Sequence, residues 1–231
     1  MITAISGNNT YFCGKRPIVT VLDSTEQKKL AEYKQQFDYS QNKPISASLK
    51  HAIDVTSSVV GLIVTAPVII ISSIAIKLES DGPILFKQNR VGKDGQIFTI
   101  YKLRTMAMNS GEKLLQNPDD QRVTKVGKFL RKYSIDEFPQ FINIIKGDMS
   151  LVGPRPIIEN VHNVRKNDKD FCLRYMVKPG ATLIYPNKVE IDNKPNLRID
   201  TEKDYIEHWS LANDIKTFLK IASKIFTGEN Y

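Results

Sequence analysis

The sequence predicts an α+β fold: a mostly helical domain with a small β-hairpin that follows a membrane-inserted helix. Three observations support this class. An apolar run without charges is followed by two short strand-like segments around a glycine-containing turn, and longer helical patterns come after them. We divide the chain into an N-terminal polar extension (residues 1–47), a membrane segment (residues 48–80) and a domain (residues 81–231).

The N-terminal extension is polar and weakly patterned. It predicts a helix from about Thr25 to Phe37, with Ser24 as N-cap and Gln27 three residues later. Residues 42–44 are typical of a linker. The N-terminus lacks a basic start followed by an apolar run, so we expect no signal peptide. The extension fits either a partner-docking arm or a disordered tail.

The composition restricts the class of partner. The net charge of +8 suits nucleic acid, acidic lipid headgroups or phosphorylated substrates. Because no nucleic-acid-binding motif occurs, we expect no nucleic-acid partner. Cys13 and Cys172 lie far apart and form no CxxC pattern, which argues against a disulfide framework or a structural zinc site.

The apolar run from Val55 to Ile76 has 22 residues and no charge. As a helix it is about 33 Å long, enough to cross a bilayer core. A spanning helix is the simplest interpretation, and a buried core helix is disfavoured because such helices seldom lack a polar face for so long. Pro67, in the middle, kinks a helix, so the segment can also turn back within one leaflet.

The soluble region begins with the predicted hairpin. Residues 84–86 and 96–101 are strand-like, and residues 92–95 form the turn. Basic side chains surround these strands, and they either line an anion groove or lie on a solvated strand face. They are Lys87, Arg90, Lys102 and Arg104.

Residues 126–145 predict a helix that is interrupted at residues 134–139 and capped by Gly147. The adjacent carboxylates of Asp136 and Glu137 lie in the interruption. Taken alone, a capping box of Ser134 with Glu137 is the simpler interpretation. The same geometry suits catalysis, with Arg131 holding a phosphate beside an ionised carboxylate.

Two further patterns leave alternatives open. Arg155 stands between Pro154 and Pro156, and this rigid presentation suits bidentate phosphate binding, although a buried structural ion pair is the competing explanation. Residues 211–226 predict a helix with an apolar face and a lysine-rich face. Such a helix packs on a core or lies on an anionic membrane surface.

The segments GPILFKQNRVGKDG, IYKLRTM and VGKFLRKYSIDEFPQFINIIKGDMSLVGPRP follow the apolar run in this order. Together with that run they resemble the bacterial sugar transferase family, the monotopic phosphoglycosyl transferases that act on polyprenol phosphate. The resemblance covers residues 48–156, and its last block is long and specific.

The resemblance implies that Asp136 is the nucleophile and Glu137 its partner, with Mg²⁺ as the cofactor held by these two carboxylates. Asp136 would attack the sugar-bearing phosphate of a UDP-sugar, release UMP and pass the phosphosugar to polyprenol (undecaprenyl) phosphate. Phosphate-holding or substrate-holding positions would be Arg131, Arg155, Lys87, Arg90, Lys102, Arg104 and Asp214.

The resemblance also implies a cytosolic catalytic domain on a re-entrant helix broken at a Ser-Pro pair. Ala66 replaces the serine here, but Pro67 is retained, so re-entry is favoured over spanning. The expected location is the cytoplasmic face of the bacterial inner membrane, in contact with lipids. The expected pathway is exopolysaccharide, capsule or other glycan assembly, with later glycosyltransferases as partners.

One stretch departs from the family pattern. After Pro179-Gly180 the family has a Thr-Gly-leading segment with a Gln and a Gly-Arg pair, whereas this chain has ATLIYPNKVE. We interpret residues 181–191 as shaping donor specificity, with Tyr185, Asn187 and Lys188 as candidate contacts. The alternative function is a catalytically inactive membrane interaction protein derived from the family, which the intact Asp136, Glu137 and Arg155 disfavour.

Overall fold

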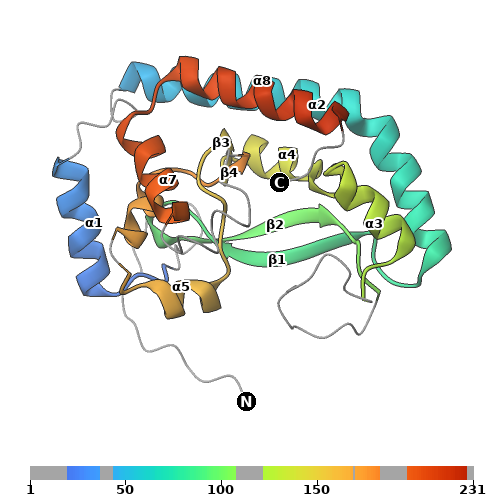
Figure 1. Cartoon of the computed structure of the whole chain (residues 1–231), viewed down its shortest axis with the longest axis horizontal. Helices are drawn as coiled ribbons and strands as arrows, with labels where there is room; N and C mark the ends of the chain where they lie inside the picture. The colour runs from blue at the N-terminus through green and yellow to red at the C-terminus, as the bar shows by residue number, and fades with distance from the viewer. Residues whose placement is uncertain (1–19, 37–43, 108–121, 169, 183–196, 228–231) are drawn as a thin grey trace.

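The computed structural model describes residues 20–36, 44–107, 122–168, 170–182 and 197–227 (Figure 1). Helices dominate this part of the chain, and an antiparallel hairpin lies beneath them, so the predicted mostly helical α+β class with a small hairpin is confirmed. The elements are α1 (Ser24–Gln36), α2 (Pro44–Glu79), β1 (Leu85–Val91), η2 (Lys93–Gly95), β2 (Ile97–Leu103), α3 (Lys125–Lys132), η3 (Ile135–Glu137), α4 (Gln140–Ile145), β3 (Ser150–Val152), α5 (Glu159–Arg165), η4 (Phe171–Met176), β4 (Gly180–Thr182), α7 (Leu197–Glu207) and α8 (Leu211–Thr227).

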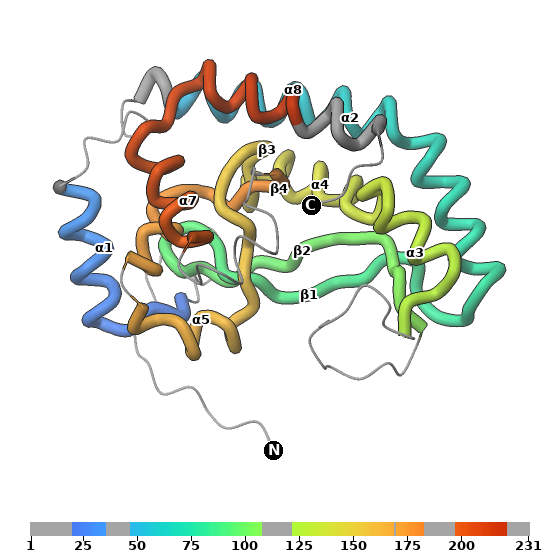
Figure 2. The backbone as a smooth tube through the Cα atoms, in the orientation of Figure 1, coloured from blue at the N-terminus to red at the C-terminus, as the bar shows by residue number. Residues whose placement is uncertain are grey.

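Helix α2 carries the apolar run. Its residues Ala47–Glu79 are long and apolar enough to cross a membrane, and only 11% of their most apolar window is buried, so α2 is not a core helix. The helix continues through Pro67 instead of breaking there, and it bends along its length (Figure 2). Thr65 donates its hydroxyl hydrogen to the Gly61 carbonyl at 2.7 Å, as expected for a hydroxyl in an apolar helix.

The hairpin pairs Leu85 with Leu103 at one end and Val91 with Ile97 at the other. Strand β1 is longer than predicted because the polar residues that follow residue 86 also pair across the hairpin, and β2 continues to Leu103, which pairs with Leu85. Gly95 has a φ of 71°, and a Cβ there would lie 2.4 Å from Leu22, so the turn requires glycine.

Helix α4 joins the hairpin to the membrane helix. The fully buried Asn143 donates to the Thr99 carbonyl at 2.7 Å and accepts from the Tyr101 N–H at 3.0 Å. On another side of α4, Phe141 lies so close to Gly61 of α2 that a Cβ there would be 2.9 Å from the ring. The position of β2 is therefore fixed relative to α2.

Helix α1 packs on the domain. It begins one residue earlier than predicted, and the capping box is formed by Asp23 and Glu26 instead of Ser24 and Gln27. Leu22 and Leu30 join the hydrophobic core around η4. This part of the N-terminal extension is thus built into the fold, whereas residues 1–19 and 37–43 lie outside the described residues.

A buried ion cluster holds the start of α2. The Lys50 ammonium lies 2.9 Å from an Asp54 oxygen and 2.7 Å from an Asp214 oxygen of α8. Asp214 also accepts from the Trp209 indole at 3.0 Å, and Asp54 accepts from the Leu151 N–H of β3 at 3.3 Å. One cation thus joins α2 to α8, and Asp54 joins α2 to β3.

The predicted helix at residues 211–226 is confirmed as α8, which runs along the same edge of the molecule as the first part of α2 (Figure 1). Leu211 and Phe218 pack against the core clusters. Ile215 and Leu219 are 49% and 61% exposed. The apolar face of α8 therefore packs partly on the core and stays partly uncovered in the described chain.

The ion cluster predicts a large cost for removing its cation. Lys50→Met leaves two buried carboxylates without their ammonium, and we expect the free energy of unfolding to fall by about 3–5 kcal/mol. Denaturant unfolding in detergent measures it. The matched control is Lys34→Met, which removes the 40%-exposed partner of Asp94 and should cost less than about 1 kcal/mol. Equal losses in the two variants would contradict the prediction.

Candidate functional site

The two adjacent carboxylates lie in η3, a short 3-10 turn between α3 and α4. Ser134 has a left-handed backbone, with φ of 53°, and its N–H donates to the Arg131 carbonyl at 3.2 Å. A capping serine needs an extended backbone, and the Ser134 side chain makes no capping bond. The capping-box interpretation is therefore wrong, because Ser134 has a left-handed backbone and its side chain caps no N–H group.

Glu137 lies between two cations from distant parts of the sequence. Its Oε1 is 2.5 Å from the Lys102 ammonium of β2 and 3.1 Å from an Arg155 nitrogen in the loop after β3. Burial tends to raise the pKa of Glu137, but the charges and hydrogen bonds of Arg155 and Lys102 outweigh it and lower that pKa to about 2. Glu137 is therefore ionised at neutral pH.

Asp136 has a different environment. Its side chain is 9% exposed, and burial, followed by the neighbouring negative charge of Glu137, raises its pKa. The charges of Lys102, Arg131 and Arg155 act in the opposite direction. Arg131 is itself held by a bond from its Nε to the Thr105 hydroxyl at 2.9 Å. The turn therefore presents Glu137 as a fixed anion and Asp136 as a buried carboxylate that is influenced by three cations.

Arg90 lies close enough to this cluster for the charges of Arg155 and Glu137 to affect its pKa. Its guanidinium donates to the Pro156 carbonyl at 3.1 Å and to the Gln88 side chain at 2.6 Å. Burial and the charge of Arg155 lower the pKa of Arg90 to about 10. The structure thus brings Arg90 to the loop that carries Arg155.

Lys87 does not join the cluster. It pairs across the hairpin with Tyr101, one residue out of phase with Lys102, so the two lysines project from opposite faces. The Lys87 ammonium lies over the Tyr101 ring, 5.9 Å from its centroid, and Lys146 lies 5.1 Å from the same centroid. This part of the hairpin is a separate basic and aromatic surface.

Two further predicted positions also lie outside the cluster. Arg104 donates to the backbone carbonyls of Ser80 and Asp81 at the end of α2, and it is buried there. Asp214 belongs to the buried ion cluster with Lys50. In this structure both residues hold elements of the fold together.

The sequence interpretation missed two contributors. Thr105 holds Arg131, and its place beside Arg104 in the motif IYKLRTM was the available signal. The Glu79 carboxylate accepts from the N–H groups of Lys125 and Val126 at 2.7 and 3.0 Å, so the last residue of α2 caps α3. Nothing in the sequence signalled this contact, because Glu79 and the start of α3 are far apart in the chain.

The donor set restricts how Mg²⁺ could bind. Among the described residues no three His, Cys, Asp or Glu side chains form a metal site. Asp136 and Glu137 still offer adjacent carboxylates, and Mg²⁺ is often held by one or two carboxylates together with substrate phosphates. The residues therefore fit Mg²⁺ that arrives with a phosphorylated ligand.

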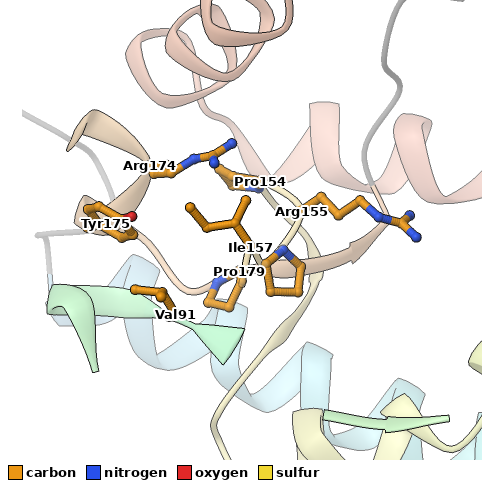
Figure 3. Close-up of a pocket in the computed structure, with 9 residues that line it drawn as sticks. Val91, Pro154, Arg155, Ile157, Arg174, Tyr175 and Pro179 are labelled. Atoms are coloured by element: carbon orange, nitrogen blue, oxygen red, sulfur yellow. The ribbon is translucent and has the colours of Figure 1, made fainter. Parts of the chain in front are cut away.

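A hollow lies behind the loop that carries Arg155. Figure 3 shows the Arg155 side chain extending away from Pro154, Ile157 and Pro179, which line this hollow with Arg174 and Tyr175. The divergent stretch begins nearby, in β4, where the Thr182 hydroxyl donates to the Leu151 carbonyl at 2.7 Å. The candidates Tyr185, Asn187 and Lys188 lie outside the described residues.

Comparisons with known proteins identify the family. The family model described as bacterial sugar transferase matches residues 45–228. The UDP-N-acetylgalactosamine-undecaprenyl-phosphate N-acetylgalactosaminephosphotransferase of Aeromonas hydrophila is 39% identical over 195 residues, 80% of this chain and 45% of that protein. The UDP-glucose:undecaprenyl-phosphate glucose-1-phosphate transferase of Escherichia coli K12 is 37% identical over 193 residues, 80% of this chain and 42% of that protein.

A protein of the same name from Caulobacter vibrioides is 38% identical over 194 residues, 78% of this chain and 71% of that protein. The chain thus spans less than half the length of the Aeromonas and Escherichia relatives, and 71% of the length of the Caulobacter relative. The family match covers most of the sequence, including η3, its cations and all of α2 except Pro44. The chain belongs to the bacterial sugar transferase family.

Proposed function

We propose that this chain moves a sugar 1-phosphate from a UDP-sugar to undecaprenyl or another polyprenyl phosphate and so initiates exopolysaccharide, capsule or other glycan assembly. The observation that carries the proposal is Asp136, a buried carboxylate beside an ionised one and within the influence of three cations. The printed names of the Aeromonas and Escherichia relatives support the donor and acceptor classes.

In the proposed reaction an Asp136 oxygen attacks the phosphorus that bears the sugar. The bond from this phosphorus to the oxygen of the UMP phosphate breaks, which leaves an aspartyl phosphosugar and releases UMP. An oxygen of polyprenyl phosphate then attacks the same phosphorus, the bond to Asp136 breaks, and the carboxylate is restored. Two steps at one carboxylate suit a site that meets a soluble and a lipid substrate in turn.

The cations have distinct tasks. Arg155 is 51% exposed at its side chain and can contact a donor phosphate while it stays near Glu137. Lys102 and Arg131 add positive charge where negative charge accumulates during transfer. If Mg²⁺ binds with the donor, Asp136 and Glu137 are the residues that would hold it, and it would supply further neutralisation of the negative charge on the leaving UMP.

We also propose that α2 is a re-entrant membrane helix on the cytoplasmic face of the inner membrane. Both of its ends are held by the same domain: Lys50 pairs with Asp214 of α8, whereas Glu79 caps α3 and Arg104 binds the following carbonyls. A straight spanning helix would put these ends on opposite sides of the bilayer core, about 30 Å apart. The bend of α2 supports the re-entrant topology.

The nucleophile assignment predicts that Asp136→Asn abolishes transfer, with at least a 10³-fold loss of UMP release, because an amide cannot form the aspartyl phosphosugar. Incubation of the wild-type protein with a UDP-sugar alone should leave sugar phosphate on the peptide that contains Asp136, as detected by mass spectrometry. A panel of UDP-sugars with undecaprenyl phosphate identifies the donor. The assignment is wrong if the Asn variant keeps wild-type turnover.

The ion pairs of Glu137 predict a pH-dependent contribution to stability. Because the pKa is lowered from 4.5 to about 2 in the folded protein, this carboxylate stabilises the fold above pH 4.5. The stability difference between the wild-type protein and Glu137→Gln should shrink as the pH falls from 4.5 towards 2, as measured by denaturant unfolding. Asp168→Asn, which removes the exposed partner of Arg165, is the control and should change stability little. A pH-independent difference for Glu137→Gln would contradict the lowered pKa.

The topology predicts where introduced cysteines are labelled. Ser48→Cys and Asp81→Cys, in a chain whose native cysteines are replaced by serine, lie at the two ends of α2 and are exposed. Membrane-impermeant thiol reagents should reach both from the cytoplasmic side and neither from the periplasmic side. In the same background Pro67→Leu should straighten the helix and move part of the population to a spanning topology. Periplasmic labelling of the Ser48 position without the Pro67 change would refute re-entry.

A further inference from the structure

The loop that carries Arg155 is held by carbonyl groups on both sides of that residue. Because Pro154 and Pro156 have no N–H, only their carbonyls can be fixed by hydrogen bonds. The Pro154 carbonyl accepts from the Gly180 N–H at 2.9 Å, and the Ile157 carbonyl accepts from the Val91 N–H at 2.8 Å. Between them the Pro156 carbonyl accepts from Arg90 at 3.1 Å.

The first side of the loop cannot move easily. A Cβ at Gly180 would lie 2.1 Å from the Gly153 nitrogen, so the two backbones are in direct contact. On the other side, the Pro156 carbonyl accepts its hydrogen bond from the long Arg90 side chain of β1. Arg155 itself points away from this packed region (Figure 3). The direction in which Arg155 leaves the loop therefore depends on Arg90.

The hydrogen-bonding groups of Arg90 are largely used inside the protein. One terminal nitrogen binds the Pro156 carbonyl and the other binds Gln88, while the buried Nε has no hydrogen-bond partner among the described residues. The Arg90 charge also lies near the like charge of Arg155, which is unfavourable by itself. These contacts suit a residue that fixes the backbone at Pro156, and they leave few N–H groups of the guanidinium available to bind a ligand.

We infer that Arg90 is a positioning residue, which fixes the Pro156 carbonyl so that Arg155 reaches Glu137 and the donor phosphate, and that it does not contact substrate. The inference rests on the proposed transfer reaction and revises the sequence-based assignment of Arg90 to phosphate binding. The distance of 3.1 Å between Arg155 and Glu137 leaves little tolerance, because a shift of 1 Å would break the contact.

A double-mutant cycle tests how Arg90 acts. Arg90→Gln should lower kcat/KM about 10²-fold, the scale of a misplacement of about 1 Å. In a chain that already carries Arg155→Gln, the Arg90→Gln change should cost less than about twofold, because its effect passes through Arg155. Arg90→Lys, which keeps a donor for the Pro156 carbonyl, should recover part of the loss. Losses that multiply in the double variant would show that Arg90 acts independently of Arg155 and would overturn the inference.

A second measurement needs no activity. In Arg90→Gln, hydrogen exchange should accelerate at the Val91 amide, which bonds to the carbonyl that follows Pro156, while exchange at the Gly180 amide and in α4 stays unchanged. The control is Arg165→Gln, which removes the same charge from the surface pair with Asp168. Unchanged exchange at the Val91 amide overturns the positioning role. Faster exchange in a chain that transfers no sugar phosphate with any donor supports positioning and refutes the proposed function instead.

Discussion

The structure depends most on one lysine between two buried carboxylates. Lys50 neutralises Asp54 within α2 and Asp214 on α8, and all three side chains are withdrawn from water. A cluster with one cation and two anions is tolerable there because N–H and O–H donors also bind the aspartates, among them the Trp209 indole and the Leu151 amide. Since Leu151 belongs to β3, the cluster links the membrane helix to the strand that precedes the Arg155 loop.

The other end of α2 is linked to the site through β2. Lys102 and Arg104 are two residues apart, so they leave the chain on the same side. Lys102 meets Glu137, while Arg104 binds the carbonyls after α2. The Glu79 carboxylate adds a cap on α3, the helix that carries Arg131. The candidate site is therefore attached to both ends of the apolar helix, which suits the proposed reaction between a soluble donor and a lipid acceptor.

Local patterns predicted the elements better than the partners. The limits of α1 and α8 were right to within a residue or two, since caps and apolar periodicity lie within one segment. The turn residues of the hairpin were equally informative. The capping box at Ser134 was wrong, because the left-handed backbone of this residue and the partners of Glu137 both depend on tertiary packing. In the same way, nothing in the sequence showed that Arg104 and Asp214 are buried structural groups, whereas Lys102 contacts Glu137 in the candidate site.

The opposite environments of the two carboxylates suit the different roles that we propose for them. Glu137 is bound at its Oε1 by both Lys102 and Arg155, and its pKa is low, which suits a fixed anion. Asp136 is buried and has no hydrogen-bond donor to its carboxylate among the described residues, and its pKa is raised. A carboxylate with few hydrogen bonds keeps its electron pairs available, and the surrounding cations still favour its ionised form. An exchange of the two side chains would place the shorter carboxylate at position 137, opposite Lys102 and Arg155. The order Asp-Glu thus matches the longer side chain to the two cations that Glu137 reaches.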